Sequence, residues 1–303
     1  MGRARRRARR AHGPLRGANV TRAVTLLAPA KINLALAVAR KRADGFHELR
    51  SVFATIDLAD RVRVAPYRRL EVRMAPDVGA PPGDDLASRA VRAMARATAR
   101  EPAAFVHIRK RIPIAAGLGG GSSDAGAVLR ALASIWQRPD VDLVAVAATV
   151  GSDVPFFVSG ARVAFVSGRG EHVDPLPGPS QTHLVIVRLA ARLATQDVFA
   201  TLESEDRRAA GAVDALRDAF ARGTVTSQLL RDNARNDLLG PAERLCPAVA
   251  DARTRAAECG INLSLSGSGP TLFAIADDRR DALRIVRRLR RIGLAARAHT
   301  MGG

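Results

Sequence analysis

The sequence predicts a mixed α/β or α+β protein built from two domains. Stretches that alternate apolar and polar residues, as strands do, are interspersed along the chain with stretches of helical spacing. With 303 residues, the chain is long enough for two domains of ordinary size, each with its own core. A Pro- and Gly-rich piece at 174–179 suggests a linker. We therefore expect an N-terminal domain over 24–176 and a C-terminal domain over 180–303.

The first 23 residues differ in composition from the rest. Eight arginines lie before residue 23, among too few apolar residues to pack, so we expect a disordered arm over 1–23 without the apolar segment of a signal peptide. The net charge of +19 raises the possibility that this arm binds nucleic acid. An upstream start of translation is the alternative, and we favour it because the rest of the chain makes sense without the arm. Outside the arm, aromatic residues are few and are not interleaved with arginine, so we expect no nucleic-acid partner there.

The first predicted strand covers residues 24–39. Its alternation places Lys31 and Asn33 on one face of an otherwise apolar strand, where they need a partner, a cavity or contact with solvent. Asp44-Gly45 then predicts a hairpin, which leads to a second strand over 48–58.

Shorter strands are expected near 61–65 and 70–74, followed by a loop over 76–83. Asp84-Asp85 can cap a helix that runs to about residue 99.

The motif with the most glycine is Pro-Ile-Ala-Ala-Gly-Leu-Gly-Gly-Gly-Ser-Ser-Asp at 113–124, between an expected strand over 105–112 and an expected helix over 125–136. Glycine lets a backbone turn tightly and approach a ligand. A helix that opens on Ser122 and Ser123 carries unpaired N–H groups and a partial positive charge, so loop and helix together predict a phosphate cradle. The loop is neither a Walker A motif nor a Gly-x-Gly-x-x-Gly fingerprint, and it is denser in glycine than a structural turn requires.

A helix over 143–150 comes next, and Asp153 stands shortly after it. Pro155 should hold Val154 in an extended conformation, which would stiffen the chain around Asp153. The carboxylate would then lie at a pocket wall beside Phe156, or it would only cap a turn.

The second half of the chain continues the mixed pattern. A Gly- and Ser-rich loop at 266–271 is either a second anion contact or a tight hairpin. Strands are expected at 161–166, at 183–189, on either side of this loop within 263–275 and after 291. Helices are expected at 196–203, 209–221, 238–259 and 279–291.

Rare residues add to this interpretation. Only three of the 48 basic residues are lysines, namely Lys31, Lys41 and Lys110, and all lie within or beside the candidate segments. Cys246 and Cys259 form no metal or disulfide spacing, which fits a reducing cytosol. No apolar run reaches the roughly 20 residues of a membrane span.

Three blocks, at 29–34, 113–123 and 265–271, resemble the signature motifs of the GHMP small-molecule kinases in sequence, order and spacing. The resemblance covers residues from about 24 to 300. It implies a two-domain fold, with an N-terminal nucleotide-binding domain, a ferredoxin-like C-terminal α/β domain and the active site between them.

Two further blocks, at 43–49 and 235–238, are similar to one branch of that superfamily. This branch uses ATP, with Mg²⁺, to phosphorylate the 2-hydroxyl of a cytidine-diphosphate sugar alcohol on the non-mevalonate route to isoprenoid precursors. Another GHMP kinase, of the homoserine or mevalonate type, is the alternative, although those kinases lack the Asp-Gly-aromatic-His block. The sequence leaves the oligomeric state open.

By resemblance, Asp153 is the catalytic base and Lys31 its electrostatic partner. Phe46 and His47 would hold the cytosine, with Phe46 standing where the family commonly has tyrosine. Asn33 and Thr195 would bind the rest of the acceptor, and Ser122 or Ser123 could be a metal ligand, with no carboxylate ligand identified. The ATP-binding residues would be Lys110, Pro113, Ile114, Ala115, Ala116, Gly117, Leu118, Gly119, Gly120, Gly121, Ser122 and Ser123.

Overall fold

The computed structural model describes residues 22–43, 45, 47–77, 83–178 and 182–302. The expected arm over 1–23 lies outside the described residues except for its last two positions, and Phe46 also lies outside them. No helix of the described part is long and apolar enough to cross a bilayer.

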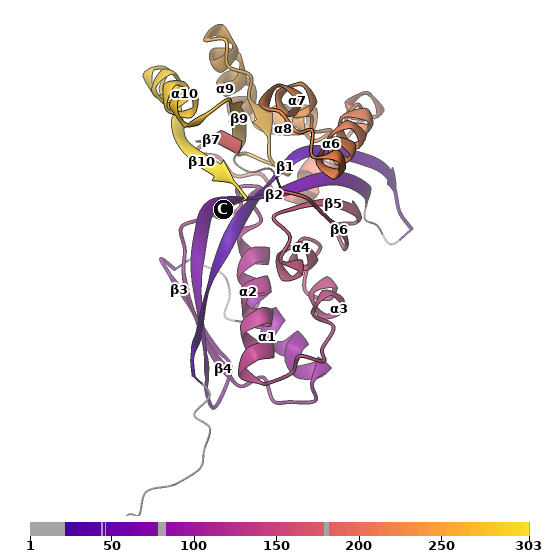
Figure 1. Cartoon of the computed structure of the whole chain (residues 1–303), viewed down its shortest axis with the longest axis vertical. Coiled ribbons are helices and arrows are strands. Elements are labelled where there is room, and N and C mark those ends of the chain that lie inside the picture. The colour runs from indigo at the N-terminus through magenta and orange to yellow at the C-terminus, as the bar shows by residue number, and fades with distance from the viewer. Residues whose placement is uncertain (1–21, 44, 46, 78–82, 179–181, 303) are drawn as a thin grey trace, which may run out of the picture.

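Two long antiparallel strands run through the molecule (Figure 1). They are β1 (Val24–Lys41) and β2 (His47–Pro66), joined by the hairpin that Asp-Gly predicted. The expectation of a break between 58 and 61 was wrong, since β2 is continuous there. Asp60 interrupts the apolar pattern, but its carboxylate accepts hydrogen bonds from the backbone N–H groups of Arg111 and Ile112, so the strand can bury it.

The N-terminal part is a sheet with helices on one face (Figure 1). Strand β2 pairs with β4 and β5, β4 pairs in parallel with β3, and β5 pairs with β6. Apolar residues of α1 and α2 pack against this sheet to form one core cluster. The elements are β3 (Glu71–Ala75), α1 (Leu86–Ala97), β4 (Ala104–Arg109), α2 (Gly120–Ile135), α3 (Leu143–Ala148), α4 (Val154–Ser159), β5 (Val163–Gly168) and β6 (His172–Leu176).

The C-terminal part continues the same sheet, so that the described residues form ten strands in one sheet. Met301 of β10 pairs with Ile56 of β2, and beyond β10 the order is β7, β9, β8. The elements are β7 (Thr182–Arg188), α5 (Thr195–Ala200), η1 (Ser204–Asp206), α6 (Ala210–Arg222), α7 (Ser227–Asn233), α8 (Leu239–Leu245), α9 (Pro247–Glu258), β8 (Ser264–Leu265), β9 (Leu272–Ala276), α10 (Arg279–Arg291) and β10 (Ala295–Met301). The mixed α/β class is confirmed, whereas the division at 177–179 stays a prediction.

Two expectations about helix starts were wrong. Helix α2 begins at Gly120 with Gly119 as its N-cap, so Ser122 and Ser123 lie in its first turn and do not cap it. Val154 is helical, because Pro155 falls in the first turn of α4, where a missing N–H costs no hydrogen bond.

Two other boundaries also differ. The expected linker is partly strand, since β6 pairs with β5 through Leu176. The single helix expected over 238–259 is two helices, because Pro247 starts α9 immediately after an extended Cys246. Helix α7 was not expected.

Candidate active site

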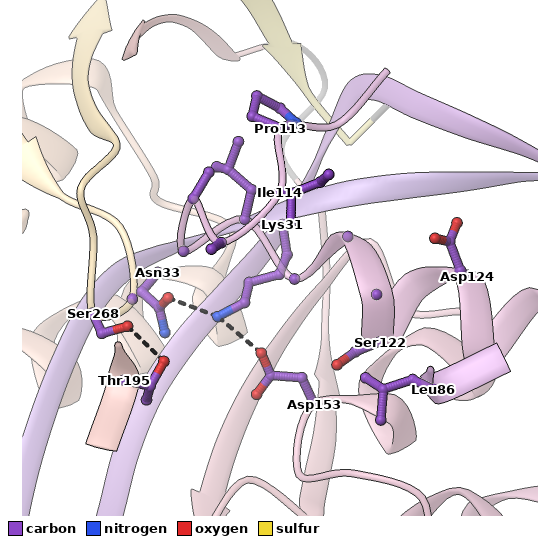
Figure 2. A pocket seen from close by; sticks show the side chains of 18 of the residues that line it. Lys31, Asn33, Leu86, Pro113, Ile114, Ser122, Asp124, Asp153, Thr195 and Ser268 are labelled. Atoms are coloured by element: carbon purple, nitrogen blue, oxygen red, sulfur yellow. Dashed lines mark hydrogen bonds and ion pairs between the residues drawn. The ribbon is translucent and has the colours of Figure 1, made fainter. Parts of the chain in front are cut away.

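A cavity of about 500 Å³ opens where the two glycine-rich loops meet (Figure 2). Its wall combines side chains of β1, the loop before α2, α1, α5 and the loop after β8. Ser123 and His47 do not line it. The predicted site residues that do line it are Lys31, Asn33, Lys110, Pro113, Ile114, Ala115, Ala116, Gly117, Leu118, Gly119, Gly120, Gly121, Ser122, Asp153 and Thr195.

The two glycine loops touch backbone to backbone. Gly117 has φ +72°, and a Cβ added there would stand 2.3 Å from the carbonyl oxygen of Ser266. Ser266 Oγ in turn donates to the Gly117 carbonyl over 3.0 Å. Gly267 has φ +57°, and an added Cβ would lie 3.0 Å from that same carbonyl oxygen. Side chains at these positions would force the loops apart, which explains the glycines physically.

The N-terminus of α2 and the glycine loop before it form a cradle on one side of the cavity. Gly119 is a left-handed N-cap that provides no side-chain hydrogen bond to the first turn. The first N–H groups of this 16-residue helix therefore have no intrahelical acceptor, and Gly120, Gly121 and Ser122 line the cavity. Such a helix terminus attracts anions, phosphate above all.

Lys31, Asn33 and Asp153 form a polar cluster beside the cradle. Figure 2 shows the Lys31 side chain reaching between the other two, with Nζ 2.8 Å from Asn33 Oδ1 and 3.2 Å from Asp153 Oδ2. Lys31 is only 4% exposed, while the Asp153 side chain keeps 28% of its surface accessible. The Lys31 N–H also donates to the Leu118 carbonyl over 2.9 Å, which ties β1 to the loop. A carboxylate open to the cavity can accept a proton from a bound hydroxyl.

A second charged cluster, which sequence reasoning missed, lies at the other end of the cradle. Lys110 Nζ donates to Asp60 Oδ2 over 2.5 Å and to Asp124 Oδ2 over 2.6 Å. Burial, reinforced by the nearby Asp60 charge, raises the pKa of Asp124 to about 7 although Lys110 opposes the shift. Ser123 Oγ and Asp124 Oδ1 are buried without a hydrogen-bond partner among the described residues. Asp60 lies 50 residues before Lys110, so no local spacing indicates the pair.

The side of the cavity that Thr195, Phe199 and Ser268 line brings together residues from both halves of the chain. Thr195 and Ser268 lie within hydrogen-bond distance, with their hydroxyl oxygens 2.9 Å apart. His47 stacks on Phe199 at a ring-centroid distance of 5.2 Å, and Phe199 lines the cavity. Burial and the nearby Arg207 and Lys41 charges lower the pKa of His47. Phe199 was not predicted as a site residue. Its position one helical turn after Thr195 could have indicated from the sequence that its ring lines the cavity.

Two parts of the chain match known protein families. Residues 85–161 match the N-terminal domain of the GHMP kinases, and residues 202–294 match their C-terminal domain. The chain belongs to the GHMP kinase family. The 4-diphosphocytidyl-2-C-methyl-D-erythritol kinase of Thermus thermophilus is 39% identical over 91% of this chain and 96% of its own. The kinase of the same name from Kineococcus radiotolerans is 39% identical over 84% of this chain and 81% of its own.

Solved structures of GHMP kinases agree. A crystal structure of 4-(cytidine 5'-diphospho)-2C-methyl-D-erythritol kinase, 37% identical, superposes with a TM-score of 0.75 over 92% of this chain and 100% of its own. A homoserine kinase from Cytophaga hutchinsonii, 17% identical, has a TM-score of 0.70 over 95% of this chain and 96% of its own, which shows the shared fold. The predicted family, branch and fold class are thereby confirmed.

Proposed function

We propose that the chain transfers the γ-phosphoryl group of ATP to the 2-hydroxyl of 4-diphosphocytidyl-2-C-methyl-D-erythritol, in the non-mevalonate route to isoprenoid precursors. One observation carries the proposal: an ionisable Asp153, paired with Lys31 at 3.2 Å, shares a cavity with a glycine cradle at a helix N-terminus. The likeness to kinases of this name supports the choice of substrate. A cytosolic location is part of the proposal, and the two free cysteines are consistent with it.

In the proposed reaction, Asp153 accepts the proton of the acceptor hydroxyl as its oxygen attacks the γ-phosphorus. Lys31 pairs with the carboxylate and offsets negative charge on the group in transfer. General-base assistance of this kind contributes roughly 10²–10⁴-fold in rate. The backbone amides at the start of α2 would hold the phosphates, since these N–H groups have no intrahelical acceptor.

Magnesium fits this site as a companion of the nucleotide. Mg²⁺ takes oxygen ligands, and it is usually held by one or two protein groups together with substrate phosphates. The described residues include no group of three His, Cys, Asp or Glu side chains that could hold a metal alone, and Ser122 presents a hydroxyl on the cavity wall. Ser122 would hold the ion together with the phosphates. Once bound, the ion would neutralise charge on the transferred group.

The acceptor would lie toward α5 and the second glycine loop. His47 and Phe199 offer a stacked pair of rings for a pyrimidine, and the proposal retains Phe46 from the sequence argument. Thr195 would contact the diphosphate or the sugar alcohol. The Asn33 amide has one N–H left after its bonds to Lys31 and Ser51, and this donor is available to the acceptor.

The decisive test is to incubate the purified chain with ATP, Mg²⁺ and 4-diphosphocytidyl-2-C-methyl-D-erythritol and to measure the product mass. We expect a gain of one phosphoryl group, and no comparable turnover with homoserine or mevalonate. Faster turnover of either of those alcohols would replace the proposed substrate while keeping the kinase assignment. No transfer to any of the three acceptors would reject the proposal.

A further inference from the structure

We propose that Ser51 is a positioning residue for the pair Lys31 and Asp153. Its hydroxyl selects the orientation of the Asn33 side-chain amide, and that amide holds the Lys31 ammonium beside Asp153. The inference deepens the proposed function and depends on it for its kinetic consequence. The structural part of the inference depends on four buried groups: the Ala35 carbonyl, the Ser51 hydroxyl, the Asn33 amide and the Lys31 ammonium. It also depends on which of them donate hydrogen bonds and which accept them.

The Ser51 hydroxyl can point in only one direction. Ser51 lies in β2 and is 0% exposed, so its hydroxyl cannot turn to solvent. Its Oγ lies 2.5 Å from the carbonyl oxygen of Ala35, which can only accept a hydrogen bond. The hydroxyl hydrogen must therefore point at Ala35, and the oxygen is left as an acceptor.

That direction fixes the amide of Asn33. Asn33 is 2% exposed, and its Nδ2 donates to Ser51 Oγ over 3.0 Å. Its Oδ1 consequently faces Lys31 Nζ at 2.8 Å, and an ammonium can only donate. A flipped amide would set an NH₂ group against the ammonium and leave the serine oxygen without a donor. Both mismatches would lie in the protein interior, where an unpaired hydrogen-bond donor or acceptor costs folding free energy.

The pairing of β1 and β2 places the hydrogen-bonded groups of Ser51, Asn33 and Lys31 beside Asp153. The β1–β2 pairing shifts register between Asn33 and Ala35, beside the point where the serine reaches the Ala35 carbonyl. Two residues beyond Ser51, the ring centroid of Phe53 lies 4.1 Å from Lys31 Nζ. Asn33, Asp153 and the ring therefore confine the ammonium, and only the Asn33 contact depends on Ser51.

A serine that merely satisfied the Ala35 carbonyl would affect stability but not Lys31. The isosteric variants Ser51→Thr and Ser51→Val separate these roles, because they differ by one hydroxyl and share any strain from the added bulk. Lys31 can be observed directly by NMR of the side-chain ammonium with ¹⁵N-labelled lysine. The chain has only three lysines, so the Lys31→Met and Lys110→Met variants assign the signals.

Lys110 is the internal control, since its ammonium is buried and held by Asp60 and Asp124. We expect slow proton exchange at Lys31 and Lys110 in the wild type and in Ser51→Thr. In Ser51→Val, exchange at Lys31 should accelerate roughly five- to tenfold, the scale of one hydrogen bond, with Lys110 unchanged. Should neither variant fold, Ser51→Ala against the wild type provides the same comparison.

The kinetic expectation is a similar fall in kcat for Ser51→Val relative to Ser51→Thr, with an unchanged KM for ATP. In an Asn33→Ala background, replacing Thr by Val at position 51 should have no further effect on kcat, because the hydrogen bonds that link residue 51 to Lys31 are already lost. Equal Lys31 exchange in the two variants, or in Ser51→Ala and the wild type, would overturn the inference. The NMR comparison stands even if the wild type fails to phosphorylate the proposed substrate, so the two failures are distinguishable.

Discussion

Asp153 and Asp124, two carboxylates on the cavity wall, differ in exposure and in their partners. Asp153 pairs with the buried Lys31 and keeps 28% of its side-chain surface accessible, whereas Asp124 is closed off and held by Lys110. An accessible carboxylate oxygen is what a proton acceptor requires.

We expect Asp153→Asn to lower kcat by roughly 10²–10⁴-fold, because the amide cannot take the hydroxyl proton. ATP should still bind, since the amides at the start of α2 are untouched. Turnover assays and calorimetric ATP titration would measure both. Asp140→Asn is the matched control, because Asp140 is exposed, pairs with Arg138 at the surface and is not among the residues that line the cavity. Wild-type turnover in Asp153→Asn would remove Asp153 from its role.

Asp124 predicts a dependence of stability on pH. Its pKa of about 7 in the folded protein lies above the ordinary value of 3.8, so between pH 4 and 7 the folded state retains a proton that the unfolded state releases. Stability should therefore decrease as the pH rises through this window, by at most about 4 kcal/mol. Urea unfolding without nucleotide or magnesium would show this fall in the wild type and a smaller one in Asp124→Asn. Equal slopes in both proteins would contradict the assignment.

The site residues that the family resemblance assigns could be predicted from the sequence. Lys31, Asp153 and the glycine loop were predicted, and the structure brings them into one cavity. Asp60 and Ser51 could not be predicted, because each acts on residues that only strand pairing brings near. The roles of all these residues in catalysis stay predictions.

At the scale of elements, the contact between the two glycine loops can be tested at Gly117. An alanine there would combine left-handed backbone strain with a clash against the Ser266 carbonyl. Gly223→Ala is the control, since Gly223 has φ +68° with no atom within 4 Å of an added Cβ. We expect Gly223→Ala to cost about 1 kcal/mol and Gly117→Ala clearly more, with weaker ATP binding in Gly117→Ala alone. Denaturant unfolding and ATP titration would report both, and equal effects of the two variants would refute the contact.

Elements were predicted well where periodicity and capping agree and poorly where the local role of a glycine, serine or proline was misjudged. Asp85 caps α1 and α10 spans Arg279–Arg291, both as expected. The start of α2 was placed too late because Ser122 suggested a cap, whereas the left-handed Gly119 provides the turn instead. Strand β6 was missed because Pro175 lies in it, at an edge strand that pairs only with β5.

On the scale of the whole molecule, the first 23 residues can be separated from the cavity. Among the residues that the structure describes, every one on the cavity wall lies at Lys31 or later. We expect a chain that starts at Val24 to retain full turnover, because none of the groups proposed for the reaction is removed. Retention on DNA-cellulose should fall with the lost arginines if the arm is a nucleic-acid arm, and otherwise stay unchanged. A loss of turnover on trimming would show that the arm contributes to the enzyme.

The long β1–β2 ribbon has a consequence for recombining this chain with related kinases. One apolar cluster combines Ile32 of β1 with Ile186 of β7 and Phe273 of β9, so the two halves share side-chain packing. A chimera of two kinases joined at 174–179 would pack apolar side chains of one parent against those of the other. Functional hybrids should arise more readily when the ribbon and the C-terminal strands are inherited from the same parent.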